Sequence, residues 1–111
     1  MEATRKKIKI FQDSNGNEPF VKWIKTVSAP TRARVFAKLD RVETGNLGDC
    51  KFIGEGVFEF RLHFGAGYRI YYGEIDNTII LLLCGGDKST LTKDVKKAKK
   101  CWNEYISRRM S

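Results

Sequence analysis

Alternating apolar and polar residues predict four strands in this chain. In Lys6–Gln12, Ile8 and Ile10 alternate with lysines, as in a strand with one buried face. The same criterion gives three more strands, at Val57–Phe64, Gly67–Ile75 and Thr78–Cys84. A short hairpin turn at Asp76–Asn77 joins the last two. Because Ile79–Cys84 is apolar on both faces, it is expected to be a central strand that is covered on both sides.

Apolar residues at helical spacing predict two helices before these three strands and one after them. The first is Phe20–Val27, with Pro19 in its first turn. The second follows Ser28 and ends near Gly45, a residue that suits a C-terminal cap. The third covers Leu91–Ser107. The apolar stripe of the second helix is Val35, Phe36, Leu39 and Val42.

The predicted order is one strand, a helical hairpin, three strands and a final helix, with a loop at residues 46–56. Most of the helical residues precede the run of adjacent strands, which favours an α+β fold with an antiparallel sheet. The 111 residues fit a single domain, residues 1–111, with one hydrophobic core.

Charge is divided unevenly along the chain, whose formal net charge is +8. Residues 1–41 and residues 88–111 each carry a net charge of +6, and residues 42–87 carry −4. A basic chain of this kind is attracted to polyanions, nucleic acid first. The alternative is a protein with many solvated lysines on its surface.

Other features restrict the compartment and the cofactors. Cys50, Cys84 and Cys101 are odd in number and lack zinc-ligand spacing, so no metal or other cofactor is expected and a reducing cytosol is favoured. The longest apolar run has six residues, far short of the ~20 that a membrane helix needs. The N-terminus lacks the pattern of a signal peptide. We therefore expect a cytoplasmic protein without membrane contact.

The hairpin FEFRLHFGAGYRIYY, residues 58–72, holds two of the three basic residues of the acidic middle segment. A two-residue loop would bury an arginine or expose apolar side chains, so a three-residue loop at Gly65–Gly67 is expected. This register places His63 opposite Arg69. It also places Arg61 opposite Tyr71. One polar face then carries Glu59, Arg61, His63, Arg69 and Tyr71.

This polar face indicates a phosphate-binding site, because like charges on neighbouring strands repel unless an anion lies between them. The exposed ring of Tyr71 is a candidate platform for stacking a base. The simpler alternatives are a surface ion pair of Arg61 with Glu59 or Glu74, and a histidine that is merely exposed.

The segments FEFRLHFGAGYRIYY and TIILLLCGGDKST and the basic helix ending in CWNEY together resemble the RelE/ParE superfamily of toxins. Within it, the chain is most similar to the HigB-like addiction module killer branch of type II toxin–antitoxin systems. The resemblance covers nearly the whole chain, from FVKWI to Tyr105. It implies a helical hairpin on an antiparallel sheet. For many members it also implies metal-independent cleavage of mRNA in the ribosomal A site, hence growth inhibition.

The resemblance also implies roles for residues. Arg69 matches the arginine that the family uses on the scissile phosphate, and Arg61 falls where a second basic strand residue is frequent. Lys88 falls near a third basic position, and Glu59 matches a more variable one. The chain departs from the family at Lys93–Val95, where KDV stands near the position of a catalytic tyrosine.

In the expected mechanism, the ribose 2′-OH of mRNA attacks the adjacent phosphate and leaves a 2′,3′-cyclic phosphate and a 5′-OH. Arg69 and Arg61 supply positive charge, and Lys88 protonates or neutralises the leaving oxygen. His63 or Glu59 is the base, with His63 favoured because imidazole exchanges protons near neutral pH. Because a 2′-OH is required, the expected substrate is RNA and not DNA.

The basic ends are expected to contact phosphates of ribosomal RNA with strong salt dependence, unless they are simply solvated helix faces. The residues assigned to this contact are Arg32, Arg34, Lys38, Lys93, Lys96 and Lys97.

The family further implies a cognate antitoxin, often a helix-turn-helix protein. Two other classes stay open, a ParE-like inhibitor of DNA gyrase without nuclease activity and a generic nucleic-acid-binding module. The arginines of the polar face favour RNA cleavage over gyrase inhibition.

Overall fold

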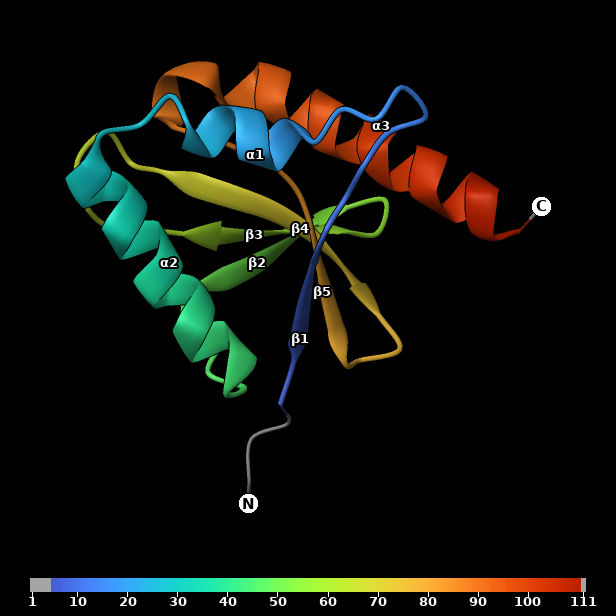
Figure 1. Ribbon diagram of the computed structural model, residues 1–111, viewed down its shortest axis with the longest axis horizontal. Helices are drawn as coiled ribbons and strands as arrows, with labels where there is room; N and C mark the ends of the chain where they lie inside the picture. The colour runs from blue at the N-terminus through green and yellow to red at the C-terminus, as the bar shows by residue number, and fades with distance from the viewer. Residues whose placement is uncertain (1–4, 111) are drawn as a thin grey trace.

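The computed structural model describes residues 5–110, whose elements follow the predicted order with one added strand (Figure 1). The elements are β1 (Lys7–Ile10), α1 (Pro19–Ile24), α2 (Ala29–Glu43), β2 (Cys50–Gly54), β3 (Val57–Arg61), β4 (Arg69–Ile75), β5 (Ile79–Gly86), the short 3-10 helix η1 (Lys88–Thr90) and α3 (Leu91–Arg109). Within residues 5–110, the strands form one sheet in the order β1-β5-β4-β3-β2. The predicted α+β fold is confirmed.

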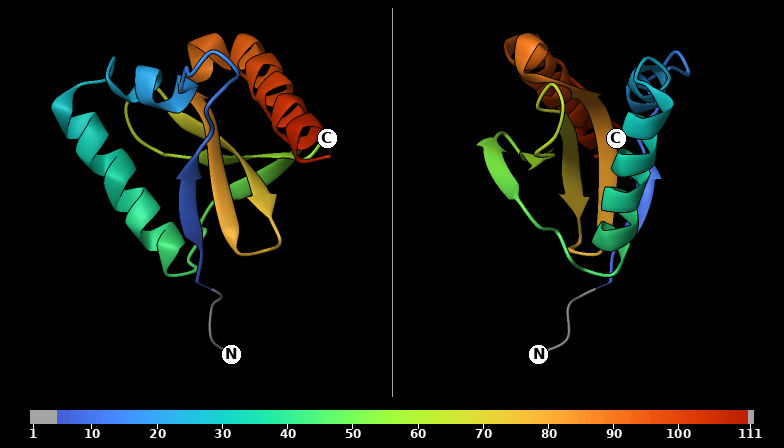
Figure 2. Two further views of the ribbon diagram at one scale, coloured as in Figure 1. Left: turned by 45° about the vertical axis from the view of Figure 1, so that its right-hand side comes forward. Right: turned by 90° about the vertical axis from the view of Figure 1, so that its left-hand side faces the viewer.

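Helices cover both faces of the sheet (Figure 2). On one face, α1 and α2 enclose a core that includes Phe20 and Phe60. On the other face, α3 packs over a core that includes Tyr71. β5 contributes Leu82 to the first core and Leu83 to the second, which confirms the prediction of a strand covered on both sides. The sheet thus divides the single predicted core into two.

Two features of the sheet differ from the prediction. Residues 46–56 are not all loop, because they include β2, in which Lys51 pairs with Glu59 of β3 in antiparallel fashion. This edge strand is mostly exposed, so no apolar alternation marks it in the sequence. β1 pairs with β5 in parallel, which makes the sheet mixed instead of antiparallel. A sequence pattern marks a strand but does not give the direction of its neighbour.

The turns agree with the prediction better than the strand pairing does. Asp76 and Asn77 both adopt positive φ, at +50° and +58°, in the turn between β4 and β5. Gly45 follows α2 at φ +93°, and its N–H donates to Val42 O at 2.9 Å. Gly67 in the hairpin loop has a φ of +74°, which glycine adopts readily.

The β3–β4 hairpin keeps the predicted faces in a different register. Arg61 lies directly opposite Arg69 instead of Tyr71. His63, expected opposite Arg69, follows the strand and lies in the loop. Both predicted pairs are therefore wrong, because the loop is longer than the three residues assumed. An even shift preserves the alternation of a strand, so Arg61 and Arg69 still share one face.

α2 buries a lysine and exposes a phenylalanine. Phe36, predicted in the apolar stripe, is 47% exposed, whereas Lys38, predicted on the basic face, is 6% exposed. Lys38 Nζ donates to Leu47 O at 2.5 Å and lies 5.0 Å from the centroid of the Phe60 ring. Burial lowers the pKa of Lys38, and the charge of Arg41 adds to this effect. The amphipathic stem and the satisfied ammonium explain why the predicted exposed position of Lys38 is wrong.

Tryptophans dock helices on both faces of the sheet at positions where a strand carries glycine. A Cβ added to Gly73 of β4 would lie 2.1 Å from Trp102 Cζ3 of α3. A Cβ added to Gly85 of β5 would lie 2.2 Å from Trp23 Cε3 of α1. Such distances leave no room for a side chain, so glycine at these two positions allows the helices to approach the sheet.

Gly73→Ala is expected to destabilise the protein by about 1–3 kcal/mol, because the new methyl group must displace the Trp102 ring within a packed core. Urea unfolding followed by tryptophan fluorescence measures this loss. The control is Ala66→Ser in the exposed hairpin loop, which should leave the unfolding midpoint unchanged. An unchanged midpoint for Gly73→Ala would contradict the packing of Trp102 on β4.

Candidate functional site

Three charged side chains meet where β3 and β4 approach the hairpin loop. Arg61 and Arg69 face each other across the two strands, and both contact Glu59. Arg61 Nε donates to Glu59 Oε1 at 3.0 Å, and Arg69 Nε lies 3.5 Å from Glu59 Oε2. We call these residues the arginine cluster. One carboxylate serves two guanidinium groups, so the cluster keeps a net positive charge.

Burial distinguishes the arginine cluster from an ordinary surface ion pair. Glu59 is 4% exposed, and the side chain of Arg69 is 15% exposed. Within residues 5–110, Arg69 Nε and Nη1 are buried without a hydrogen-bond acceptor. The hydrogen bond to Glu59 and its charge raise the pKa of Arg61. Glu59 therefore balances the charge of Arg69 only in part, because these two buried nitrogens have no acceptor among the described residues.

A cleft of about 450 Å³ opens beside the arginine cluster and is lined by Arg61, Arg69, Lys88 and parts of the hairpin loop. Lys88 lies at the start of η1. A Cβ added to Gly67 would lie 2.9 Å from Lys88 Cγ, so the lysine stem passes directly over this glycine. The cleft gathers three cations from three elements, which is a suitable environment for a phosphate group. We call it the arginine cleft.

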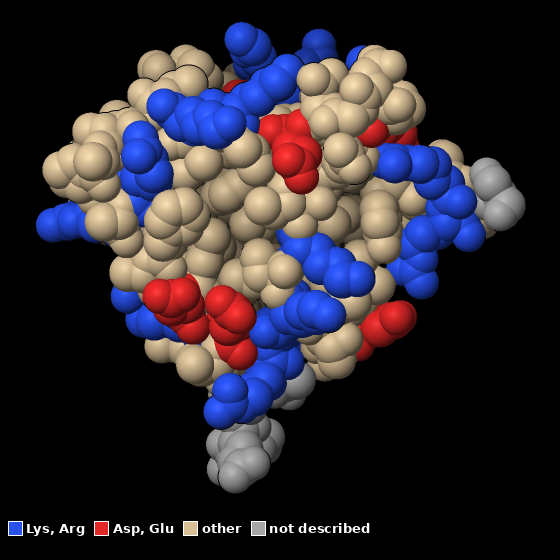
Figure 3. Space-filling view, in the orientation of Figure 1, with Lys and Arg blue, Asp and Glu red and all other residues tan. Residues whose placement is uncertain are grey.

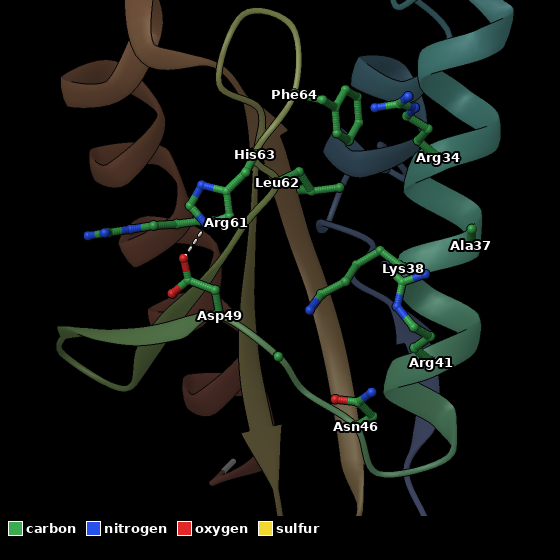
Figure 4. A pocket seen from close by; sticks show the side chains of 11 residues that line it. Arg34, Ala37, Lys38, Arg41, Asn46, Asp49, Arg61, Leu62, His63 and Phe64 are labelled. Atoms are coloured by element: carbon green, nitrogen blue, oxygen red, sulfur yellow. Dashed lines mark hydrogen bonds and ion pairs between the residues drawn. The ribbon is translucent and has the colours of Figure 1, made fainter.

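A second cleft of about 450 Å³ lies between α2 and Arg61–Phe64 (Figure 4). Its cationic lining residues on α2 are Arg34, Lys38 and Arg41. Opposite them, His63 Nε2 lies 2.5 Å from Asp49 Oδ2, and His63 is largely exposed. Arg61–Phe64 lines both clefts, so His63 stands at the boundary between them. We call this second cavity the α2 cleft.

Tyr71 does not offer an exposed ring. It is 0% exposed and belongs to the core under α3, so the prediction of a stacking platform is wrong. Burial raises the pKa of its hydroxyl, which keeps the group neutral. Within residues 5–110 this hydroxyl has no hydrogen-bond partner. The alternation placed Tyr71 on the face of the arginines, but α3 covers that part of the face.

The basic residues assigned to ribosomal RNA have different surroundings. Arg32 donates to the carbonyl of Ile24 at the end of α1 and to that of Val27 in the α1–α2 connection. The guanidinium carbon of Arg34 lies 4.7 Å from the centroid of the Phe64 ring. Lys93, Lys96 and Lys97 are exposed on α3. The face shown in Figure 3 carries its basic side chains in separate groups and not in one continuous patch.

Arg41 and Asp49 line the α2 cleft but were not predicted from the sequence. Arg34, Lys38 and Arg41 follow the spacing i, i+4, i+7 on α2, so helical periodicity could have joined them. No sequence pattern indicated a role for Asp49, which lies in the segment that was expected to be a loop. Its partnership with His63 exists only because β2 returns alongside β3.

Three further features of the described residues concern metal ions, membranes and thiols. Within residues 5–110, no group of three or more His, Cys, Asp or Glu side chains could hold a metal ion. In the same range, no helix is long and apolar enough to cross a membrane. All three cysteines are free thiols, and burial raises the pKa of Cys84 to about 12. Cys84 is 2% exposed and belongs to the core under α3.

Comparison with known sequences gives the family. Residues 22–110 match the family described as "Phage derived protein Gp49-like (DUF891)". The chain belongs to the Gp49-like family. It is also similar to an uncharacterized protein of Haemophilus influenzae, with 42% identity over 81 residues that make up 72% of this chain and 82% of the relative.

The Gp49-like family is a RelE/ParE-type toxin family, so membership confirms the resemblance at the level of the superfamily. Membership is consistent with a toxin of a toxin–antitoxin system and suggests an antitoxin partner. The family is associated in general with toxin endoribonucleases. Both clefts of this Gp49-like chain lie within the matched residues.

Glu59→Gln is expected to lower the melting temperature of this Gp49-like protein, because two opposed guanidinium groups lose their shared counter-charge. Inorganic phosphate should then raise the melting temperature of the variant more than that of the wild type. Thermal unfolding with and without phosphate measures both effects. The control is Glu55→Gln, which removes an ion pair with Lys99 at the surface. Equal responses to phosphate in all three proteins would contradict an anion site at the arginine cluster.

Proposed function

We propose that this Gp49-like protein is the toxin of a type II toxin–antitoxin system in the HigB-like branch, and that it is a ribosome-dependent endoribonuclease that cleaves mRNA. The observation that carries the proposal is the direct opposition of Arg61 and Arg69 around one buried carboxylate, beside a cleft that also contains Lys88. Phosphoryl transfer needs positive charge where the phosphorane develops, and a fixed guanidinium pair supplies it without a metal ion.

The reaction is a transesterification within the RNA chain. The 2′ oxygen of the ribose forms a bond to the adjacent phosphorus while the bond from phosphorus to the 5′ oxygen breaks. The products are a 2′,3′-cyclic phosphate and a 5′-OH. The proton of the 2′-OH must leave, and the departing 5′ oxygen must gain one, so the site needs a base and an acid.

Arg69 and Arg61 contact the non-bridging phosphate oxygens in this mechanism. Arg69 is the more restricted of the two, since its side chain is 15% exposed whereas that of Arg61 is 36% exposed. A donor that is held in place stabilises a developing charge without first having to reorganise. Lys88 is exposed at the cleft and protonates or neutralises the leaving oxygen.

His63 is the base in this proposal, with Asp49 as the residue that orients its ring. Because Nε2 faces the carboxylate of Asp49, Nδ1 remains for the 2′-OH. Glu59 is the less suitable base because both arginines already engage its oxygens. We assign to Glu59 the role of holding the two guanidinium groups in register until a phosphate arrives.

The proposed partners are the ribosome with its mRNA and a cognate antitoxin, expected to be a helix-turn-helix protein, in the cytoplasm. The exposed lysines of α3, Lys93, Lys96 and Lys97, remain proposed contacts to ribosomal RNA. A ParE-like inhibitor of DNA gyrase is the alternative function. It would require no 2′-OH chemistry and would trigger a DNA-damage response without loss of mRNA.

Arg69→Ala is expected to reduce mRNA cleavage during induced expression by at least about 100-fold, because one donor to the developing charge contributes 10²–10³ in rate. Primer extension on several transcripts measures cleavage for the wild type and the variant. The matched control is Arg109→Ala, which removes the same charge at the exposed end of α3. Intact transcripts in the wild type would contradict the nuclease proposal, and equal cleavage by both proteins would remove Arg69 from the mechanism.

His63→Gln is expected to slow cleavage by about 10²–10⁴-fold, the usual contribution of a general base, with little change in RNA affinity. Single-turnover cleavage on programmed ribosomes measures the rate, and equilibrium binding to the same ribosomes measures the affinity. A variant that cleaves at the wild-type rate would show that another group accepts the proton.

A further inference from the structure

We infer that the α2 cleft is a binding site for a nucleotide of single-stranded RNA, the one that adjoins the scissile phosphate in the arginine cleft. The inference rests on the proposed function for the identity of the scissile position. It assigns to Arg34, Arg41 and Phe64 a contact with the substrate strand itself, in place of a general attraction to ribosomal RNA.

Continuity between the two cavities is the first argument. Arg61–Phe64 lines both the arginine cleft and the α2 cleft, so the cavities lie on either side of one short segment. In Figure 4, the side chain of Arg61 points away from α2, whereas Leu62 and Phe64 point toward it. A chain whose phosphate contacts Arg61 and Arg69 therefore reaches the α2 cleft by passing His63 at the boundary.

The donor set of the α2 cleft is the second argument. Figure 4 shows Arg34, Lys38 and Arg41 extending from α2 toward the cavity. Among residues 5–110, the one carboxylate that lines the cavity is that of Asp49, which His63 already engages. The ammonium group of Lys38 donates a hydrogen bond to Leu47 O, whereas Arg34 and Arg41 are exposed. Two guanidinium groups thus remain for a phosphate, on a wall that faces the path of the strand.

The stacking geometry is the third argument. The guanidinium of Arg34 lies 4.7 Å from the centroid of the half-buried Phe64 ring. Unstacked bases of single-stranded RNA bind on aromatic rings and on guanidinium planes, and this pair offers both. The side-chain amide of Asn46 lines the same cavity and offers both a donor and an acceptor to a base edge. A mixed lining of cations, ring and amide suits a nucleotide better than a bare phosphate.

Binding can be measured without cleavage by using a fluorescent pentanucleotide RNA in which every 2′-OH is methylated. Arg34→Ala and Arg41→Ala should each weaken its binding by about tenfold to a hundredfold, the loss expected for a charge-assisted hydrogen bond. The slope of log Kd against log salt concentration should fall by about 0.7 for each phosphate that a variant no longer neutralises. Phe64→Leu should weaken binding by at least about fivefold, because leucine offers no ring on which a base can stack. Arg109→Ala, matched in charge, should bind as the wild type does.

Thermal unfolding of each variant confirms that it folds. Pentanucleotide affinities for Arg34→Ala and Arg41→Ala equal to that of Arg109→Ala would overturn the inference. It is also overturned if both variants keep RNA affinity but lose affinity for the antitoxin, since the cleft then belongs to a protein partner. Weakened RNA binding in a protein that cleaves no mRNA would sustain the RNA site while the nuclease proposal fails.

Discussion

The opposition of Arg61 and Arg69 across β3 and β4 is the constraint around which the site is organised. Two guanidinium groups on neighbouring strands repel each other, and the partial burial of Arg69 reduces the screening of that repulsion. Glu59 relieves it from the same face, at 3.0 Å from one arginine and 3.5 Å from the other. The balance is incomplete, since buried nitrogens of Arg69 remain without an acceptor among the described residues. This excess of positive charge is the basis of the proposed anion site.

The same face of the sheet serves as core at one place and as site at another. α3 covers it at Tyr71, and Trp102 packs against the bare backbone of Gly73. At Arg61 the side chain reaches the surface, with the hairpin loop and Lys88 beside it. The rigid core thus ends where the charged cluster begins. The packed core beside Glu59 and Arg69 fixes the positions of these two side chains, although both carry charge.

The burial of Glu59 favours an anion site over a solvated ion pair, although Arg61 does form the predicted pair with Glu59. An exposed pair gains little, because water screens its charges and both side chains lose freedom. Here the carboxylate is 4% exposed and serves two cations. Charged groups are seldom buried unless they are paired, and an excess of cation over anion in such a place has a cost that a ligand can offset. Family membership agrees with this interpretation, since RelE/ParE-type toxins form the wider group.

The sequence alone determined the order of most elements and the face on which each strand residue lies, because alternation and helical periodicity are local properties of the chain. It therefore placed Arg61, Arg69 and Glu59 together. Only the tertiary structure decided which residues pair across β3 and β4, because the register of a hairpin depends on the length of its loop. It also decided which part of a sheet face is buried, because the helix that covers that part is distant in the sequence. Tyr71 is buried by α3, and His63 meets Asp49 because an unmarked edge strand returns beside β3.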